Sequence, residues 1–297
     1  MRAKKISEIV GRGCTSVSFE VFPPKREMPL EPVKSAVKEM SALKPAFMSV
    51  TYGAAGGDSS VNTSAIATYV QNECGVTALA HLTCLMATRA GIALEAKRLK
   101  DAGILNILAL RGDTPQGCTK PSPEHFHHAV ELVDYLKRNF PQFSIGGACY
   151  PEGHPESVHL KDDIANTKAK VDAGLDFLTT QMFFDNNILY AYLAKLRAAG
   201  VKVPVVAGVM PVTNAKQIRR ICSLSGTLLP PRFKAIVDRF GDDPEAMLDA
   251  GIAHATGQIV DLLANGVDNI HVYTMNKPEI ARRLMANLGS LIDPSHL

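Results

Sequence analysis

The sequence predicts an α/β protein with the (β/α)8 arrangement of a TIM barrel that carries an extra helical segment before its last strand. First, a helix-like segment ending in a small residue and glycine repeatedly precedes a short apolar strand, as at Gly103, Gly174, Gly200 and Gly266. Glycine after a helix adopts the left-handed conformation that ends it. Second, the strands that follow are apolar on both faces, as buried parallel strands are.

Eight apolar segments alternate with helical ones. The candidate strands are 16–22, 46–52, 77–84, 106–111, 144–150, 176–183, 204–210 and 269–275. The candidate helices are 31–43, 62–73, 88–101, 122–138, 160–173, 186–199, 214–223 and 277–288, with the extra helical segment over 230–264. Eight such pairs favour a barrel. A doubly wound sheet uses the same alternation, but no G-x-G-x-x-G follows any strand, so a dinucleotide-binding unit has little support.

Composition is that of one globular domain over residues 1–297. Hydrophobic residues make up 46% and charged residues 21%, and no low-complexity linker divides the chain. A net charge of +3 without a basic stripe argues against a nucleic-acid partner. No apolar run approaches the ~18 residues of a membrane span, and no signal peptide is evident. We therefore expect a cytoplasmic protein without a membrane partner, whose six cysteines are reduced thiols.

Polar residues gather at the predicted strand ends, where barrels of this kind place their active sites. Glu20 is the strongest candidate for catalysis because its neighbours Phe19, Val21 and Phe22 are apolar. A carboxyl group there is poorly solvated and tends to keep its proton, which suits a general acid. A surface carboxylate is the alternative explanation.

The other strand ends leave alternatives open. His81, in an apolar strand, is as well explained by a satisfied core histidine as by a ligand contact. An ion pair at a loop would explain Arg111, although Gly112 beside it permits the close approach of a ligand. Gln181 needs hydrogen-bond partners, which a ligand or the backbone can supply. Arg111 and Lys170, with helix N-termini, are candidates for binding phosphate.

No metal site and no serine-hydrolase site is predicted. Three histidines crowd residues 125–128, but no further ligands are evident at ligand spacing. We expect these histidines to lie on a solvated helix face. A G-x-S-x-G elbow, which a Ser-His-Asp hydrolase of the α/β type requires, is missing from the sequence.

Eight motifs in order resemble the methylenetetrahydrofolate reductase family. They are SFEVFPPK at 18–25, SVTYGA at 49–54, HLTC at 81–84, LRGD at 110–113, YPEGHPE at 150–156, the run Asp163…Asn166…Lys170, TQMFFD at 180–185 and VYTMN at 272–276. They span about residues 16–290. Eight ordered motifs are far more specific than any one of them.

The resemblance implies that FAD, rather than FMN, lies across the C-terminal mouth of the barrel and that NAD(P)H donates electrons. The implied flavin contacts are Tyr52, Ala54, His81, Arg111, Gly112, Asp113, Tyr150, His154, Asp163, Asn166 and Lys170. Thr51 and Gln181 would meet the nicotinamide. The implied folate contacts are Asp113, Gln181, Gln217 and Lys277.

The implied reaction is the ping-pong reduction of 5,10-methylenetetrahydrofolate to 5-methyltetrahydrofolate, a step of one-carbon and methionine metabolism. NAD(P)H reduces the flavin and leaves, and the folate takes its place. Glu20 would protonate N10 and open the five-membered ring to an iminium ion. Asp113 would disfavour negative charge on the reduced flavin and stabilise the cationic iminium.

Two positions depart from the family pattern. Ile221 stands where some relatives place a stacking aromatic residue, and Lys277 stands where arginine is common. Lysine lacks the bidentate fork of arginine, so contacts to the folate can differ. We expect a bacterial-type catalytic core without a regulatory domain, and a homo-oligomer. Two alternatives remain at this stage: a folate methyltransferase-like barrel that binds pterin without flavin, and a subunit that acts only with an electron-supplying partner.

Overall fold

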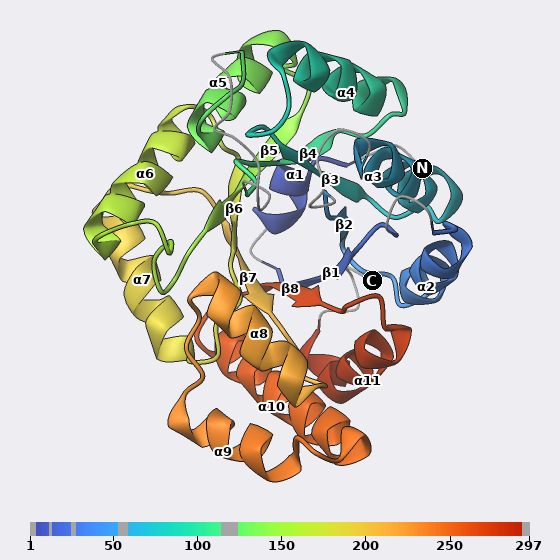
Figure 1. Ribbon diagram of the computed structural model, residues 1–297, viewed down its shortest axis with the longest axis vertical. Helices are drawn as coiled ribbons and strands as arrows, with labels where there is room; N and C mark the ends of the chain where they lie inside the picture. The colour runs from blue at the N-terminus through green and yellow to red at the C-terminus, as the bar shows by residue number, and fades with distance from the viewer. Residues whose placement is uncertain (1–3, 12–13, 25–27, 53–58, 114–123, 293–297) are drawn as a thin grey trace.

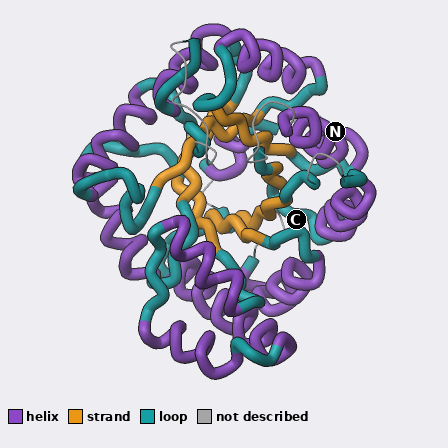
Figure 2. Tube along the Cα trace, viewed as in Figure 1, coloured by secondary structure: helices purple, strands orange, loops and turns teal. Residues whose placement is uncertain are grey.

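The computed structural model describes residues 4–11, 14–24, 28–52, 59–113 and 124–292, which form a closed barrel of eight parallel strands (Figures 1 and 2). The strands are β1 Ser16–Val21, β2 Met48–Val50, β3 Ala78–Thr83, β4 Asn106–Leu110, β5 Ser144–Cys149, β6 Phe177–Thr180, β7 Val205–Val209 and β8 Asn269–Tyr273. Each strand pairs with the next, and β8 pairs with β1. The predicted fold class is confirmed.

Helices surround the barrel on the outside (Figure 2). They are α2 Glu31–Ser41, α3 Ser59–Thr68 with the π-helical turn Tyr69–Glu73, α4 Arg89–Asp101, α5 Ala129–Asn139, α6 Leu160–Asp172, α7 Asn186–Ala198, α8 Ala215–Ser225, and α11 Pro278–Leu288 with the 3-10 turn Gly289–Leu291. Within the described part of the chain, none of the helices has both the length and the apolar character that crossing a membrane requires. The five cysteines of this part form no disulfide, and Cys118 lies outside it.

The extra helical segment predicted over 230–264 precedes the last strand as expected, and it consists of two helices. They are α9 Pro231–Phe240 and α10 Pro244–Ala264. The Asp243 side chain accepts hydrogen bonds from the backbone N–H groups of Glu245 and Ala246, which caps the second helix. Proline follows in the first turn, where its missing N–H costs nothing. These start signals explain the division.

The helix predicted over 122–138 begins only at Ala129, so the histidines at 125–128 precede it. His125 instead forms an isolated antiparallel bridge with Thr88, before α4. The prediction that these histidines lie on a helix is therefore wrong. His127 and His128 are exposed.

Side chains that point into the barrel form two layers of opposite character. The lower layer, near the N-terminal ends of the strands, consists of Phe47, Leu79, Leu108, Phe177 and Val206, all 5% exposed or less. A short helix that the sequence pattern did not predict, α1 Ile6–Val10, packs against this layer. The N–H of Ile6 donates to the Asn106 side chain at 2.8 Å. Figure 1 shows α1 inside the ring of strands.

Candidate functional site

The upper layer lies toward the C-terminal ends of the strands and consists of residues from β1, β2, β3 and β8, namely Ser18, Glu20, Ser49, His81 and His271. All five are buried. Their strand neighbours, such as Phe19 and Val50, pack outward in the main hydrophobic core. Side chains of a strand point alternately to its two faces, so this alternation puts the polar residues inside.

Glu20 lies at the centre of the upper layer and is 7% exposed. Strand register sets it beside Ser49 on one side and Tyr273 on the other. Its Oε2 atom lies 3.5 Å from the Ser49 hydroxyl, 3.7 Å from His81 Nε2 and 3.8 Å from His271 Nε2. The sequence expectation of a poorly solvated carboxyl group matches this burial, while its role as an acid stays a prediction.

His81 is an uncharged neighbour of Glu20 near neutral pH. Burial lowers the pKa of His81 from its usual 6.5 to about 4, against the opposing effect of the nearby Glu20. The Nε2 atom of His81 is buried and has no hydrogen-bond partner among the described residues. An orphaned polar atom of this kind is typical of a site that a ligand completes.

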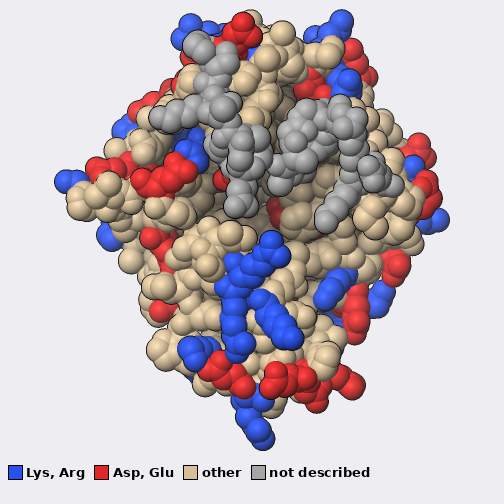
Figure 3. Space-filling view, in the orientation of Figure 1, with Lys and Arg blue, Asp and Glu red and all other residues tan. Residues whose placement is uncertain are grey.

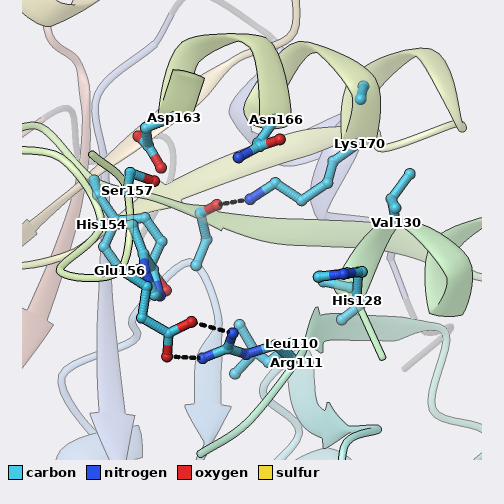
Figure 4. Close-up of a pocket in the computed structure, with 15 residues that line it drawn as sticks. Leu110, Arg111, His128, Val130, His154, Glu156, Ser157, Asp163, Asn166 and Lys170 are labelled. Carbon is cyan, nitrogen blue, oxygen red and sulfur yellow. Dashed lines mark hydrogen bonds and ion pairs between the residues drawn. The ribbon is translucent and has the colours of Figure 1, made fainter. Parts of the chain in front are cut away.

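A cavity of ≈ 400 Å³ opens beside the ends of β4 and β5 and gathers six of the residues predicted to contact the flavin (Figure 4). Those six are Arg111, Tyr150, His154, Asp163, Asn166 and Lys170. They come from three separate segments of the chain, which the fold brings together. Glu156, Ser157 and His128 line the same cavity.

One face of α6 supplies three of these residues. Asp163, Asn166 and Lys170 stand three and four residues apart, which places them along one side of a helix. The Lys170 ammonium donates to the Ala148 carbonyl oxygen at 2.6 Å, and burial lowers the pKa of Lys170. Burial likewise raises the pKa of Asp163, whose Oδ2 has no partner within the described residues.

Arg111 is held by Glu156 from the segment between β5 and α6. The two guanidinium nitrogens donate to the two carboxylate oxygens at 2.5 and 2.6 Å. This bidentate bond raises the pKa of Arg111 and lowers that of Glu156. Arg111 is thus in an ion pair, one of the two explanations the sequence left open. Gly112 has a φ of +82°, and a Cβ there would lie 2.9 Å from Thr83 Cβ, so the backbone itself requires glycine.

Tyr150 and His154 form the third side of the cavity. Their rings meet edge to face with centroids 4.7 Å apart. His154 Nδ1 accepts a hydrogen bond from the Glu156 backbone N–H at 3.1 Å, and burial, helped by Arg111, lowers the pKa of His154. The imidazole is therefore neutral with its proton on Nε2.

The remaining predicted residues are spread around the mouth. Thr51 and Tyr52 follow β2 and are half-buried, and Asp113 is exposed just after β4. Gln181, directly after β6, is half-buried, and its side-chain oxygen accepts from the Met182 N–H at 2.9 Å. Ala54, predicted to contact the flavin, lies outside the described residues.

Gln217 and Lys277 do not line the cavity and lie on the side of β7 and β8. Both are exposed, and Lys277 Nζ donates to the Thr213 hydroxyl at 3.1 Å. Figure 3 shows Lys and Arg side chains gathered over α8. The exposed cations of α8 are Lys216, Arg219 and Arg220. Arg219 is paired with Asp238 at 3.1 Å.

Sequence reasoning did not single out Ser49, His271 or Glu156. His271 stands between apolar residues in its strand, as His81 does, so the same pattern that marked His81 was available for it. Ser49 and Glu156 carry no local signal because their roles depend on partners far along the chain. Ser49 meets His271 across 222 residues, and Glu156 meets Arg111 across 45.

Comparisons with known proteins identify the family of the chain. Residues 5–289 match the family model described as methylenetetrahydrofolate reductase. The 5,10-methylenetetrahydrofolate reductases of Pectobacterium carotovorum subsp. carotovorum and Escherichia coli are 35% and 34% identical to it. Each alignment covers 96% of this chain, with 93% and 94% of those proteins.

Two further likenesses are more limited. Methylenetetrahydrofolate reductase (NADH) 1 of Zea mays is 36% identical over 98% of this chain, which spans only 51% of the plant protein. A solved Clostridium thermocellum protein, described as uncharacterized and as binding two copies of 5-methyl-5,6,7,8-tetrahydrofolic acid, has a TM-score of 0.66 at 13% identity. That match covers 97% of this chain and 99% of the other. At such low identity it shows the fold alone.

Proposed function

The chain belongs to the methylenetetrahydrofolate reductase family, and from that premise we propose that it reduces 5,10-methylenetetrahydrofolate to 5-methyltetrahydrofolate with electrons from NAD(P)H through FAD. The proposal rests on one juxtaposition. A cavity with two cationic side chains, Arg111 and Lys170, opens at the same end of the barrel as the buried carboxyl group of Glu20. The cationic cavity fits a phosphate-bearing cofactor, and the buried carboxyl group fits proton transfer to a substrate.

The donor set of the cavity fits FAD. Lys170 uses one donor on Ala148 within the described residues, and an ammonium has three. Two donors thus remain for a pyrophosphate. The unpartnered Oδ2 of Asp163 suits a ribose or ribityl hydroxyl. Arg111 already binds Glu156, so it is the less available of the two cations. Bound FAD would supply two-electron transfer between NAD(P)H and the folate.

The chain's own residues then act on the folate. Glu20 would donate its proton to N10, which breaks the C–N10 bond of the five-membered ring and leaves an iminium ion at N5. Hydride addition to that carbon gives the methyl group of the product. Asp113 would offset the positive charge of the iminium, and Gln181 would orient the pterin ring.

The outer part of the folate carries carboxylates, and the mouth offers cations for them. Gln217 and Lys277 would contact this part, and the exposed cations of α8 make this edge of the mouth electropositive. Because Lys277 binds as a point charge, we expect its contribution to be sensitive to salt.

The test starts with the colour of the purified protein. A flavin spectrum, and release of FAD on denaturation identified by mass, are expected. Lys170→Met should weaken FAD binding about tenfold to a hundredfold, because a charge-assisted hydrogen bond is lost. Lys168→Met is the matched control, since Lys168 lies on the same helix and pairs with Asp172 at 2.7 Å instead. Equal weakening by both variants would contradict the proposed cavity.

Anaerobic half-reactions complete the test. NADH or NADPH should bleach the flavin, and 5,10-methylenetetrahydrofolate should restore its colour. A colourless protein that takes up methyltetrahydrofolate but no FAD would favour the methyltransferase-like alternative. In a third outcome, NAD(P)H fails to bleach the flavin, a chemical reductant bleaches it, and the folate then reoxidises it. That result would indicate an electron-supplying partner subunit.

A further inference from the structure

We propose that Thr274 and Asn276, which follow β8, are positioning residues that hold the end of β1 and thereby place the Glu20 carboxyl group for its reaction. Their side chains take the part that the backbone of a neighbouring strand plays elsewhere in the barrel. The inference rests on the proposed function, in which Glu20 is the acid. It deepens that role by naming the residues that position the acid.

The paired register of β1 and β8 ends at Glu20. The two strands stay paired in parallel up to Glu20 opposite Tyr273. The next four residues of the chain form a turn, in which the Lys277 N–H donates to the Thr274 carbonyl oxygen at 3.0 Å. This turn takes the backbone of β8 out of the ladder just where β1 carries its acidic side chain.

Side chains of this turn continue the ladder where the backbone has left it. Thr274 is fully buried, and its hydroxyl group donates to the Glu20 carbonyl oxygen at 2.7 Å. Asn276 binds Phe22 twice: its Oδ1 accepts from the Phe22 N–H at 2.8 Å, and its Nδ2 donates to the Phe22 carbonyl oxygen at 2.8 Å. A carbonyl oxygen only accepts and a backbone N–H only donates, so the direction of all three bonds is fixed.

The same stretch of β1 is held on its other side by the chain that follows β2. There the Thr51 N–H donates to the Val21 carbonyl oxygen at 3.0 Å. The backbone is therefore bonded at Glu20 and Phe22 toward β8, and at Val21 toward β2. Three successive residues of β1 are fixed in this way, and the first of them carries the carboxyl group.

Backbone strain in the turn also points to a function. Met275 and Asn276 have φ values of +54° and +57°, in the left-handed region. Asparagine adopts this conformation more readily than most residues, whereas for methionine it is uncommon. Such strained positions persist where the surrounding structure holds them, and they cluster at functional sites. Glycine would adopt the same backbone freely but has no amide group to bind Phe22, so the bonds to β1 explain an asparagine at 276.

Two substitutions at Thr274 separate its hydrogen bond from its packing. Thr274→Val keeps the shape of the side chain and removes the hydroxyl group, so the folate half-reaction should slow about tenfold, because small misplacements of a reacting group are costly. Thr274→Ser keeps the hydroxyl group and should retain most of the parent rate. Flavin reduction by NAD(P)H should stay near normal in both, as stopped-flow absorbance would measure. Equal slowing of the folate half-reaction by valine and serine would contradict the role of the hydroxyl group.

Asn276→Gly removes both bonds to Phe22 and leaves no side chain on a strained backbone. It should slow the folate half-reaction about tenfold to a hundredfold and leave flavin reduction near normal. Lys44→Gly is the matched control, because Lys44 also has a left-handed backbone, with a φ of +52°, but precedes β2 at the opposite end of the barrel. It should leave both half-reactions unchanged.

Crystal structures of the parent protein, Thr274→Val and Asn276→Gly test the positioning without turnover. The Glu20 carboxyl group should move by about 1 Å or more, or take up two positions, in both variants. A carboxyl group that stays in place overturns the inference, and so does equal slowing of the two half-reactions.

The outcomes separate this inference from the proposed function. If the carboxyl group moves in the variants but the parent protein does not turn over the folate, the positioning is supported and the function is contradicted. If one variant fails to fold, as far-ultraviolet circular dichroism would show, the other still tests the inference, since each removes a separate contact with β1.

Discussion

The lower and upper layers of the barrel interior differ in chemistry although both are buried. The lower layer comes mainly from β3, β4, β6 and β7, and the upper layer comes from β1, β2, β3 and β8. Phe177 and Leu108 in the lower layer are buried apolar side chains that need no partner beyond van der Waals contact. Glu20 and His81 in the upper layer are also buried, but each has a polar group that burial penalises. His271 joins the two, because its ring stacks on Phe47 with centroids 5.6 Å apart. The comparison teaches that burial alone does not distinguish a core from a site.

The largest expected effect is kinetic and lies in the upper layer. Glu20→Gln should slow the folate half-reaction about 10²–10⁴-fold, because an amide has no acidic proton to give. Flavin reduction by NAD(P)H should stay near normal, as it needs no proton from this group. Stopped-flow absorbance with each substrate separately measures both rates. Equal slowing of the two would mean that Glu20 positions the cofactor instead.

The matching change in the lower layer should affect stability rather than chemistry. Phe177→Ala should lower the free energy of unfolding by about 3–5 kcal/mol, since the ring fills space against Gly146, where a Cβ would lie 2.4 Å from it. Urea denaturation measures the loss. Phe240→Ala, at a 39% exposed position on α9, is the control and should cost much less. A small loss for Phe177→Ala would show that the lower layer is not the tightly packed region.

His81 should make the upper layer sensitive to acid. Its pKa falls from 6.5 to about 4 in the folded protein, so between these values the unfolded chain binds a proton that the folded protein does not. Stability is fully present above about pH 6.5 and declines as the pH falls toward 4, by up to about 3 kcal/mol in total. His81→Gln should flatten this dependence in urea titrations at several pH values. If the free energy of unfolding of the variant fell with pH as steeply as that of the parent protein, the acid sensitivity would belong to other groups.

The smallest effect is expected at the edge of the upper layer. A Cβ at Gly208 would lie 2.4 Å from the Tyr273 hydroxyl, which donates to the Thr180 carbonyl oxygen at 2.6 Å. Gly208→Ala should therefore cost about 1–3 kcal/mol of stability. Gly257→Ala on α10 meets nothing within 4 Å and should be neutral or stabilising. Melting temperatures of the two variants would decide. Equal values would show that the Tyr273 side chain and the Thr180 carbonyl oxygen, which would lie 2.6 Å from the new Cβ, both shift at little cost.

The strands and most helices were predictable because their signals are local. Apolar runs and glycine stops placed all eight strands, and the bounds differ by a few residues at most. Helix α1 was not predicted, because its five residues are too few to show helical periodicity. The break before α10 did have a local signal in Asp243 and Pro244, which the long apolar pattern of the segment obscured.

The site was predictable only in part, for a related reason. Glu20 was identifiable from its apolar neighbours, and the α6 residues from their spacing. The surroundings of Glu20 depend instead on strand register, which sets Ser49 beside it, and on barrel closure, which brings in His271. The Arg111–Glu156 pair depends on the path of the segment between β5 and α6. No pattern within one segment of the sequence predicts such contacts between distant segments.

The pairing of β1 with β8 also bears on how the protein is made. Ser18 and His271 lie 253 residues apart, so a ribosome adds this partner of the first strand long after the strand itself. Until then β1 has an open edge on that side, and Glu20 lacks half of its surroundings. Contacts between distant segments form slowly and leave such edges exposed to other chains. A nascent chain halted before β8 should therefore be prone to aggregate, however well its earlier helices and strands have formed.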